Sequence, residues 1–188
     1  MERRRIVAVI GNARLDDQGD VHLCEELGDA LVTAGYRVLT GGLGGVMEAV
    51  SKGARCSNAW FDGAVIGITP SYLASDANPY CDIVIPTGLR IARNVIVASA
   101  ADVVVAFKGG AGTLSEIAIA WQLGKPILAL GGHGWSGELA GRSVDDRREA
   151  ETVVACSDIA AVIQQLHAAC ARDGREPHDI GLGPRRDQ

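Results

Sequence analysis

Short apolar runs alternate with longer stretches of helical spacing along most of this 188-residue chain. Apolar runs that predict β-strands occupy residues 5–10, 36–40, 63–69, 82–86, 102–107, 126–130 and 151–156. The stretches between them that predict helices are 20–34, 46–58, 89–100, 113–123 and 158–171. A strand that is apolar along its whole length is typical of a parallel sheet covered on both faces. The alternation therefore predicts one doubly wound α/β domain, with a mostly parallel sheet and helices on both faces.

The boundaries of these segments carry their own signals. Asp20 is the expected N-cap of the first helix, and Gly35 closes that helix. Residues 70–80 are rich in Ser, Asp, Asn and Pro and predict a loop, and the glycine-rich segment 131–141 predicts a mobile loop. Residues 1–171 are expected to form the domain. The polar tail at 172–188 is predicted to be disordered.

Composition narrows the possible partners. The net charge is −5, and the one basic run, Arg3-Arg4-Arg5, directly precedes the first strand, so no footprint for nucleic acid is expected. The first apolar stretch ends at Gly11 and is too short for a signal sequence or a membrane span. Five cysteines are scattered without any C-x-x-C pair, which argues against a metal site or a disulfide framework. We expect a cytoplasmic protein without membrane contacts.

Two glycine-rich loops join an expected strand to an expected helix. One runs from Lys108 to Glu116 and reads KGGAGTLSE, and the other, at residues 41–45, reads GGLGG. Such loops place bare backbone N–H groups at a helix N-terminus, where they can bind a phosphate. In a doubly wound sheet, ligands bind outside the carboxyl ends of the strands. The pattern predicts a nucleotide or another phosphorylated small molecule as the ligand.

Common enzyme motifs do not fit. The first strand lacks the G-x-G-x-x-G that would follow it in a dinucleotide-binding domain, and no G-x-x-x-x-G-K-[ST] loop occurs. The chain has neither G-x-S-x-G nor H-E-x-x-H. Its lysines, Lys52, Lys108 and Lys125, lie in no recognisable Schiff-base setting, which argues against pyridoxal phosphate chemistry.

The ordered motifs resemble the LOG-like superfamily of Rossmann-type proteins. They are GGLGGVMEAV at 41–50, Arg93-Asn94 with Ala101-Asp102 downstream, and GGAGTLSE at 109–116. The resemblance spans about residues 5–170. This superfamily contains cytokinin-activating nucleoside 5′-monophosphate phosphoribohydrolases, often mislabelled lysine decarboxylases, and molybdenum-cofactor carrier proteins. Segments 78–80, 87–89, 92–94 and 131–135 look more like the carrier branch.

The resemblance implies roles for particular residues. Arg93 and Glu116 match the catalytic pair of the phosphoribohydrolases, whereas Lys108 replaces the proline of that branch and Asn94 replaces its lysine. The residues that would bind phosphate or nucleotide are Gly42, Gly44, Gly45, Met47, Asn94, Gly109, Gly110, Ala111, Gly112 and Thr113. Members usually form homodimers, and some assemble further, so a homo-oligomer is expected. Hydrolysis in this family requires no cofactor.

The chemistry supports the same residues. Cleaving a ribosyl C–N bond develops positive charge on the sugar, which a carboxylate such as Glu116 can stabilise, or it can activate water. Arg93 can bind phosphate or orient Glu116. Because both residues are retained, the sequence favours a phosphoribohydrolase. The alternative, supported by Lys108 and Asn94, is a non-catalytic protein that binds molybdopterin or another nucleotide-like ligand.

Simpler structural roles remain open for the same residues. Thr113 and Glu116 also form a capping box, in which Thr113 caps the helix and Glu116 returns to the cap. Arg93 could pair with a surface carboxylate, and the loop at 41–45 could be only a tight turn. His22 and His133 are expected to be surface residues rather than ligands. Trp135 either closes over the site or anchors its loop.

Overall fold

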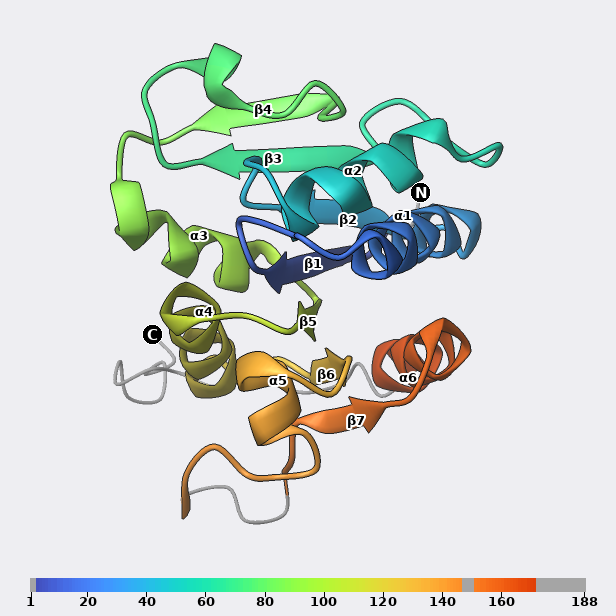
Figure 1. The fold of residues 1–188 in the computed structure, drawn as a ribbon, viewed down its shortest axis with the longest axis vertical. Coiled ribbons are helices and arrows are strands. Elements are labelled where there is room, and N and C mark those ends of the chain that lie inside the picture. Colours follow the sequence, from blue (N-terminus) through green and yellow to red (C-terminus); the bar gives the residue numbers. More distant parts are fainter. Residues whose placement is uncertain (1–2, 147–150, 172–188) are drawn as a thin grey trace, which may run out of the picture.

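Seven parallel strands form a single sheet in a computed structural model that describes residues 3–146 and 151–171 (Figure 1). The spatial order is β4-β3-β2-β1-β5-β6-β7, and every pair of neighbours is parallel. The strands are β1 (Ile6–Gly11), β2 (Arg37–Thr40), β3 (Val65–Thr69), β4 (Ile83–Pro86), β5 (Val103–Phe107), β6 (Ile127–Leu130) and β7 (Val154–Cys156). The predicted doubly wound α/β domain is confirmed.

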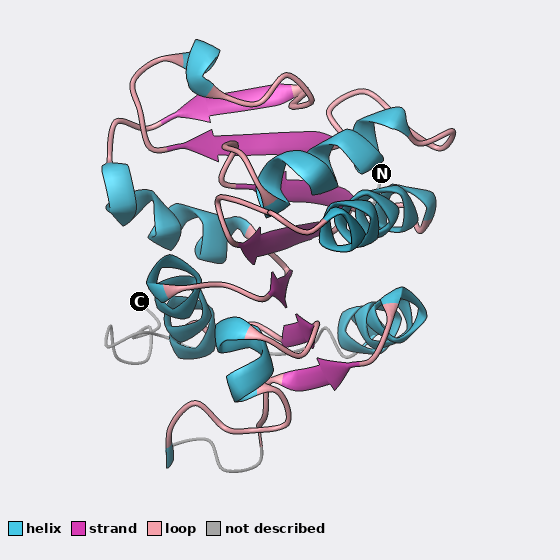
Figure 2. Cartoon of the chain, viewed as in Figure 1, coloured by secondary structure: helices cyan, strands magenta, loops and turns pink. Residues whose placement is uncertain are grey.

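Helices cover both faces of this sheet (Figure 2). They are α1 (Gln18–Thr33), α2 (Val46–Cys56), α3 (Arg93–Ala100), α4 (Ala111–Gln122), α5 (Gly134–Leu139) and α6 (Ile159–Ala171), with short 3-10 helices η1 (Ala74–Asp76) and η2 (Arg90–Ala92). Helices α1, α2 and α6 lie on one face, and α3 and α4 lie on the other.

The order of the strands changes direction at β1. Strands β2, β3 and β4 follow one another on one side of β1, whereas β5, β6 and β7 follow one another on its other side. Strands β1 and β5 are in register from Val7 opposite Val103 to Gly11 opposite Phe107. At such a switch point the loops that follow the two strands diverge and leave a crevice at the carboxyl edge.

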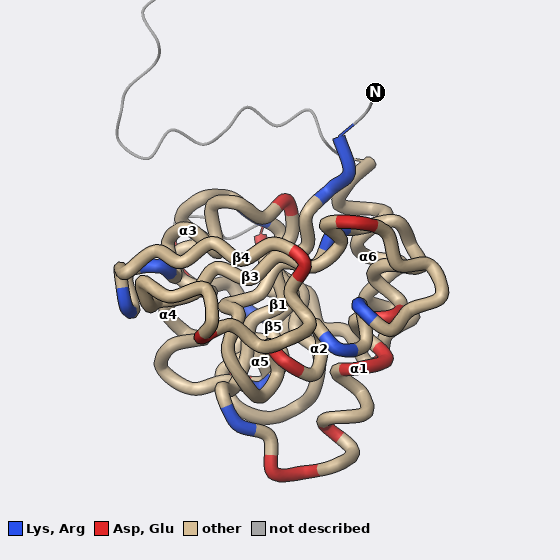
Figure 3. Tube along the Cα trace, turned by 90° about the horizontal axis from the view of Figure 1, so that it is seen from above, with Lys and Arg blue, Asp and Glu red and all other residues tan. Residues whose placement is uncertain are grey.

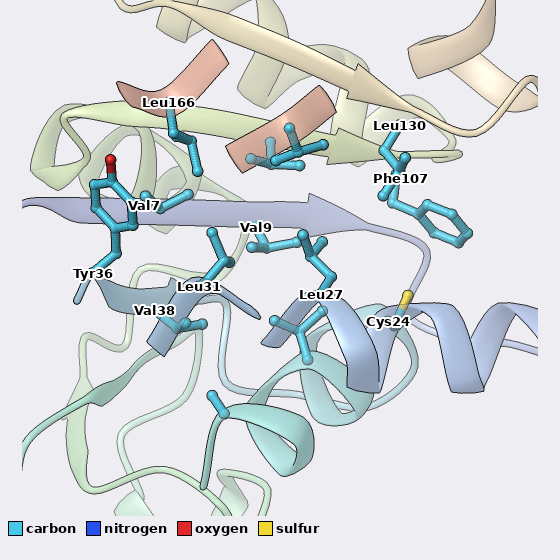
Figure 4. Packing of buried hydrophobic residues seen from close by; sticks show 14 of the residues in the cluster. Val7, Val9, Cys24, Leu27, Leu31, Tyr36, Val38, Phe107, Leu130 and Leu166 are labelled. Atoms are coloured by element: carbon cyan, nitrogen blue, oxygen red, sulfur yellow. The ribbon is translucent and has the colours of Figure 1, made fainter. Parts of the chain in front are cut away.

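Alternate residues of β1 feed two separate apolar layers. Val7 and Val9 pack under α1 and α6 with Leu27, Leu31 and Leu166, as Figure 4 shows. Ala8 and Ile10 face the opposite layer, where Val97 of α3 and Ile117 of α4 are buried. Successive side chains of a strand point to opposite faces of the sheet. Because both faces of β1 are covered by apolar layers, every residue of this strand has to be apolar.

Several predicted boundaries are wrong for local reasons. Asp17, not Asp20, caps α1, because its side chain accepts a hydrogen bond from the Asp20 N–H at 3.0 Å. The expected loop at 131–141 contains α5, and the expected loop at 70–80 contains η1. The expected helix at 89–100 begins as η2 before it becomes α3. The tail at 172–188 lies outside the described residues, so its predicted disorder stays a prediction.

The N-terminal basic residues have structural partners. Arg3 donates to Asp102 at 2.6 and 3.0 Å, and the N–H of Ile6 donates to the same carboxylate at 2.7 Å. The guanidinium of Arg4 lies 4.0 Å from the centre of the Phe61 ring. Figure 3 shows basic and acidic residues interspersed around the described trace. No helix within residues 3–146 and 151–171 has the length and apolar character needed to cross a bilayer.

Helices α1 and α2 approach each other through two glycines. A Cβ on Gly53 would lie 1.8 Å from the carbonyl oxygen of Glu25, and a Cβ on Gly28 would lie 2.1 Å from that of Val50. Both neighbours are backbone atoms, so they cannot rotate away. The close contact holds α2, and with it the loop before α2, at the carboxyl edge of the sheet.

We predict that Gly53→Ala destabilises the fold by about 3 kcal/mol or more, because its methyl group forces the two helix backbones apart. Urea unfolding followed by circular dichroism measures the change. Gly112→Ala is the matched control, since Gly112 is also helical but has no atom within 4 Å of its Cβ position. There we expect no loss and up to about 1 kcal/mol gain from helix propensity. Equal losses in both variants would contradict the prediction.

Candidate functional site

An open cavity of about 890 Å³ lies at the carboxyl edge of the sheet. Its walls are the end of β1 with the following loop, the loop between β2 and α2, the segments at 70–76 and 88–94, and the first turns of α4. The cavity therefore occupies the crevice that the strand order creates. Its volume falls in the range of about 300–1,000 Å³ that is usual for small-molecule sites.

Arg93 and Glu116 meet at the wall of this cavity. Nη1 of Arg93 donates to Oε1 of Glu116 at 3.3 Å, and the two side chains are only 11% and 9% exposed. Arg93 is the first residue of α3 and Glu116 lies in the second turn of α4. Gly41 makes room for the pair, because a Cβ there would lie 2.2 Å from Nη1 of Arg93. The predicted partners are thus brought together, and Arg93 has a buried carboxylate rather than a surface one.

Burial changes the ionisation of both groups. Desolvation raises the pKa of Glu116 from 4.5 to about 7, although the charge of Arg93 opposes this rise. Desolvation likewise lowers the pKa of Arg93, against the opposing charge of Glu116. A carboxyl group that titrates near neutral pH can take up or release a proton, which suits general acid or base catalysis and also proton-linked binding.

The loop between β5 and α4 together with the first turn of α4, residues 108–113, forms a segment that we call the cradle. Gly110 is the N-cap of α4 and supplies no side-chain cap, so the first N–H groups of the helix have no intrahelical acceptor. Gly110, Gly112 and Thr113 line the cavity, whereas Gly109 and Ala111 do not. Gly110 and Gly112 have open space where a Cβ would stand. Their lack of side chains is not required by packing and leaves the cradle accessible to a ligand.

The capping-box interpretation of this helix is wrong. Because α4 begins at Ala111, Thr113 is its third residue rather than its cap, and Glu116 lies one turn too far along to reach the cap. Glu116 accepts from Arg93 instead. The first turn of α4 is thus left without a side chain that satisfies its N–H groups.

Asn94 ties α3 to the cradle. Its Nδ2 donates to Oγ of Ser115 at 2.8 Å, and Ser115 in turn donates to the carbonyl oxygen of Gly112 at 2.7 Å. Asn94 also lines the cavity. The residue that departs from the hydrolase pattern therefore has a structural role in holding the cradle.

Lys108 is the first residue of the cradle, and its backbone and side chain are both held in place. Its φ is +54°, its ammonium group pairs with Asp20 of α1, and its carbonyl oxygen accepts from the N–H of Ser136 at 3.0 Å. The N–H of Trp135 donates to the carbonyl oxygen of Gly109 at 3.0 Å. The backbone of α5 thus braces the cradle. The Trp135 side chain is 39% exposed and does not line the cavity.

The second glycine loop is mainly a tight turn. A Cβ on Gly45 would lie 2.3 Å from the carbonyl oxygen of Asn12, and one on Gly42 would lie 2.8 Å from Cγ2 of Thr69. Of this loop and the start of α2, the cavity is lined by Gly41, Leu43 and Met47. The structure does not bring Gly42, Gly44 or Gly45 to the cavity wall.

Other candidate groups lie outside the site. His22 pairs with Glu26 on an exposed face of α1, and His133 precedes α5. None of the five cysteines forms a disulfide, and burial raises the pKa of Cys24 to about 12 and of Cys81 to about 11. Within the part of the chain that the structure describes, no group of three His, Cys, Asp or Glu residues could hold a metal ion.

Comparison with known proteins shows the family of this chain. Residues 4–163 match the SLOG cluster4 family. The chain belongs to this family. The resemblance to LOG-like Rossmann-type proteins is thereby confirmed. An uncharacterized protein of Archaeoglobus fulgidus is 37% identical to this SLOG protein over 124 residues, which are 66% of this chain and 78% of the relative.

Solved structures of similar proteins cover nearly the whole chain. The molybdenum cofactor binding protein of Rippkaea orientalis is 32% identical with a TM-score of 0.78, covering 90% of this chain and 99% of that one. The Moco carrier protein of Chlamydomonas reinhardtii is 31% identical with a TM-score of 0.74, covering 90% and 99%. The similarity thus extends over most of the chain.

Part of the cavity wall was missed by sequence reasoning. Tyr72, Asp76, Arg90 and Ile91 line the cavity from segments that follow β3 and β4. No motif marked them, and residues 70–80 read only as a loop. Their position at the carboxyl ends of two neighbouring strands was the available signal.

We predict that Glu116 makes the fold less stable as pH rises. Between pH 4.5 and about 7 the folded protein keeps a proton that the unfolded chain releases, so the free energy of unfolding falls through this window. The contribution is on the order of 2–3 kcal/mol. Urea unfolding from pH 5 to 8 should show a decline in the wild type that Glu116→Gln lacks. Glu138→Gln, at an exposed position of α5, should follow the wild type, and a parallel decline in all three proteins would refute the assignment.

Proposed function

We propose that this SLOG protein binds the molybdenum cofactor, a phosphorylated pterin, and carries it without chemical change. The observation that supports this most directly is the open cradle, where the first N–H groups of α4 and two glycines with free space face a large cavity. A helix N-terminus of this kind suits the terminal phosphate of the cofactor. The names of the two similar solved proteins, a molybdenum cofactor binding protein and a Moco carrier protein, support the same ligand.

The buried pair would complete the site. The second nitrogen of the Arg93 guanidinium, Nη2, has the sulfur of Met47 at 4.0 Å, a weak acceptor, and remains available for an oxyanion. The carboxylate of Glu116 can accept N–H groups of the pterin ring. Asn94 and Lys108 support the carrier function because both hold the cradle in shape.

Hydrolysis of a nucleoside 5′-monophosphate is the second candidate. It is favoured by one observation, the Glu116 carboxyl with a pKa of about 7 at the cavity wall beside Arg93. In that reaction the C–N bond to the base breaks, water adds to C1′ of the ribose, and the base leaves with a proton. Glu116 would stabilise the positive sugar or take the proton from water, and Arg93 would orient it. This activity needs neither a metal nor an organic cofactor.

One experiment separates carriage from hydrolysis. The protein is incubated anaerobically with the molybdenum cofactor, desalted, and its retained pterin is measured by fluorescence after oxidation. We expect wild-type retention, a loss of about tenfold or more in Arg93→Ala and Gly112→Val, and full retention in Arg142→Ala, which changes an exposed arginine outside the cavity lining.

The same preparation is tested with a panel of nucleoside 5′-monophosphates. We expect no free base. Release of a base by the wild type that disappears in Glu116→Gln would establish the hydrolase and contradict simple carriage. Retention of pterin without release would support the carrier.

We also propose that the protein is a homodimer. Seven large apolar side chains are exposed on β4, on the segment after β3, and on η2, the residue before it and the first turn of α3. These are Tyr72, Leu73, Ile83, Ile85, Leu89, Ile91 and Val95, which we call the apolar surface. Ile91 and Tyr72 are 86% and 83% exposed. An exposed apolar patch beside a binding site is typical of an interface between subunits.

We expect Ile85→Glu to yield a monomer, because a desolvated carboxylate at the centre of an apolar interface is costly. Light scattering after gel filtration gives the mass, to be compared with 19.6 kDa for one chain. Ile85→Val keeps the apolar character and should stay dimeric. A wild type that elutes as a monomer would rule out the proposal.

Two further expectations, a partner other than nucleic acid and a reducing compartment, are compatible with a carrier of a small molecule. Basic and acidic residues are interspersed in the described chain, which supports a partner other than nucleic acid. Cysteines that form no disulfide support a reducing compartment such as the cytoplasm.

A further inference from the structure

Arg90 lies at the cavity wall in an unusual backbone conformation. Its φ is +51°, and within the described residues only Lys108 shares a positive φ among non-glycine residues. The N–H of Arg90 donates to the carbonyl oxygen of Pro70 at 3.0 Å, and that of Gly88 donates to Ser71 at 2.8 Å, which fixes this turn. An L-residue in the left-handed region pays a conformational cost that glycine avoids, and such residues cluster at functional sites.

The guanidinium of Arg90 has no hydrogen bond or ion pair with any residue in the described parts of the chain. Two cations at the cavity and the cradle have partners, since Arg93 pairs with Glu116 and Lys108 pairs with Asp20. Asp76 lines the same cavity but forms no ion pair with Arg90. Arg90 therefore supplies an uncompensated positive charge at the wall of a site that receives an anion.

The position of Arg90 places this charge away from the cradle. Its backbone is held by Pro70, directly after β3, whereas the cradle follows β5. Strands β3, β2, β1 and β5 are consecutive in the sheet, so three strand spacings, about 14 Å, separate the two ends. A long arginine side chain spans part of this gap. A ligand bound by its phosphate at the cradle would present a second group to Arg90.

We propose that Arg90 binds a second anionic group of the ligand, separate from the phosphate at the cradle. This inference rests on the proposed function only in taking the cradle as the phosphate site. The ligand class is a small molecule with two anionic groups. In the molybdenum cofactor the second group is the metal-oxo dithiolene, and in a nucleotide it is a second phosphate on the ribose. A guanidinium can bind either through paired N–H donors.

Matched ligand pairs test the inference in the full-length protein. Calorimetry compares molybdenum-loaded with metal-free molybdopterin, and adenosine 3′,5′-bisphosphate with adenosine 5′-monophosphate. Arg90→Ala should weaken binding of the molybdenum-loaded cofactor and of the bisphosphate about tenfold, or about 1.4 kcal/mol, and change binding of the other two ligands less than twofold. Arg90→Lys should recover part of the loss, and Arg142→Ala should match the wild type. A loss confined to one pair identifies the source of the second anion.

Arg90→Gly separates binding from folding. We expect it to raise the melting temperature by about 2–4 °C, because glycine relieves the positive φ, while it weakens binding as much as Arg90→Ala. A lower melting temperature in Arg90→Gly would show that the side chain supports the fold, and would overturn the inference. Gel filtration of each variant confirms that the oligomeric state is unchanged.

The outcomes distinguish this inference from the proposed function. If the wild type retains the pterin cofactor and Arg90→Ala binds all four probes equally well, the inference fails and the carrier function stands. If pterin is not bound but the bisphosphate depends on Arg90, the carrier function fails and the inference stands. A wild type that binds none of the probes overturns both.

Discussion

The candidate site depends on one buried ion pair. Arg93 and Glu116 come from different helices, α3 and α4, and meet at 3.3 Å where little water reaches them. Burial moves both pKa values toward neutrality, so desolvation outweighs their mutual attraction. Such a pair contributes little net stability. Its value lies in fixing a cation and a titratable carboxyl group at the wall of a cavity, at a position that Gly41 keeps open.

Lys108 and Asn94, the two residues that differ from the hydrolase pattern, both hold the cradle in place. Lys108 links the cradle to α1 through Asp20, and Asn94 links it to α3 through Ser115. Helix α5 adds two backbone hydrogen bonds from the third side. The cradle is therefore held rigidly without the proline and lysine of the hydrolase branch. A rigid anion site loses little entropy on binding, which serves a carrier as well as an enzyme.

The sheet was predictable because strands buried on both faces have to be apolar throughout, and the order of motifs led to Arg93 and Glu116. The helix starts were harder. The capping box fails because Gly110, which carries no side chain, already takes the cap position three residues before the expected cap, Thr113. The sequence did not predict helix α5, because a glycine-rich segment is typical of a loop. In the structure Gly134 is the first residue of this helix and has a positive φ. Arg90 could not be found from local sequence, since its conformation depends on hydrogen bonds to the segment after β3.

The protonation state of Glu116 depends on the ligand that is placed beside it. Near its pKa of about 7 the carboxyl group exists in both forms, so it can accept an N–H as a carboxylate or donate as an acid. A ligand that brings N–H donors favours the carboxylate, whereas a phosphate placed beside it favours the protonated form. Under the proposed carrier function, the carboxylate form would accept N–H groups of the pterin. The hydrolase alternative would instead use both forms, because its reaction moves a proton.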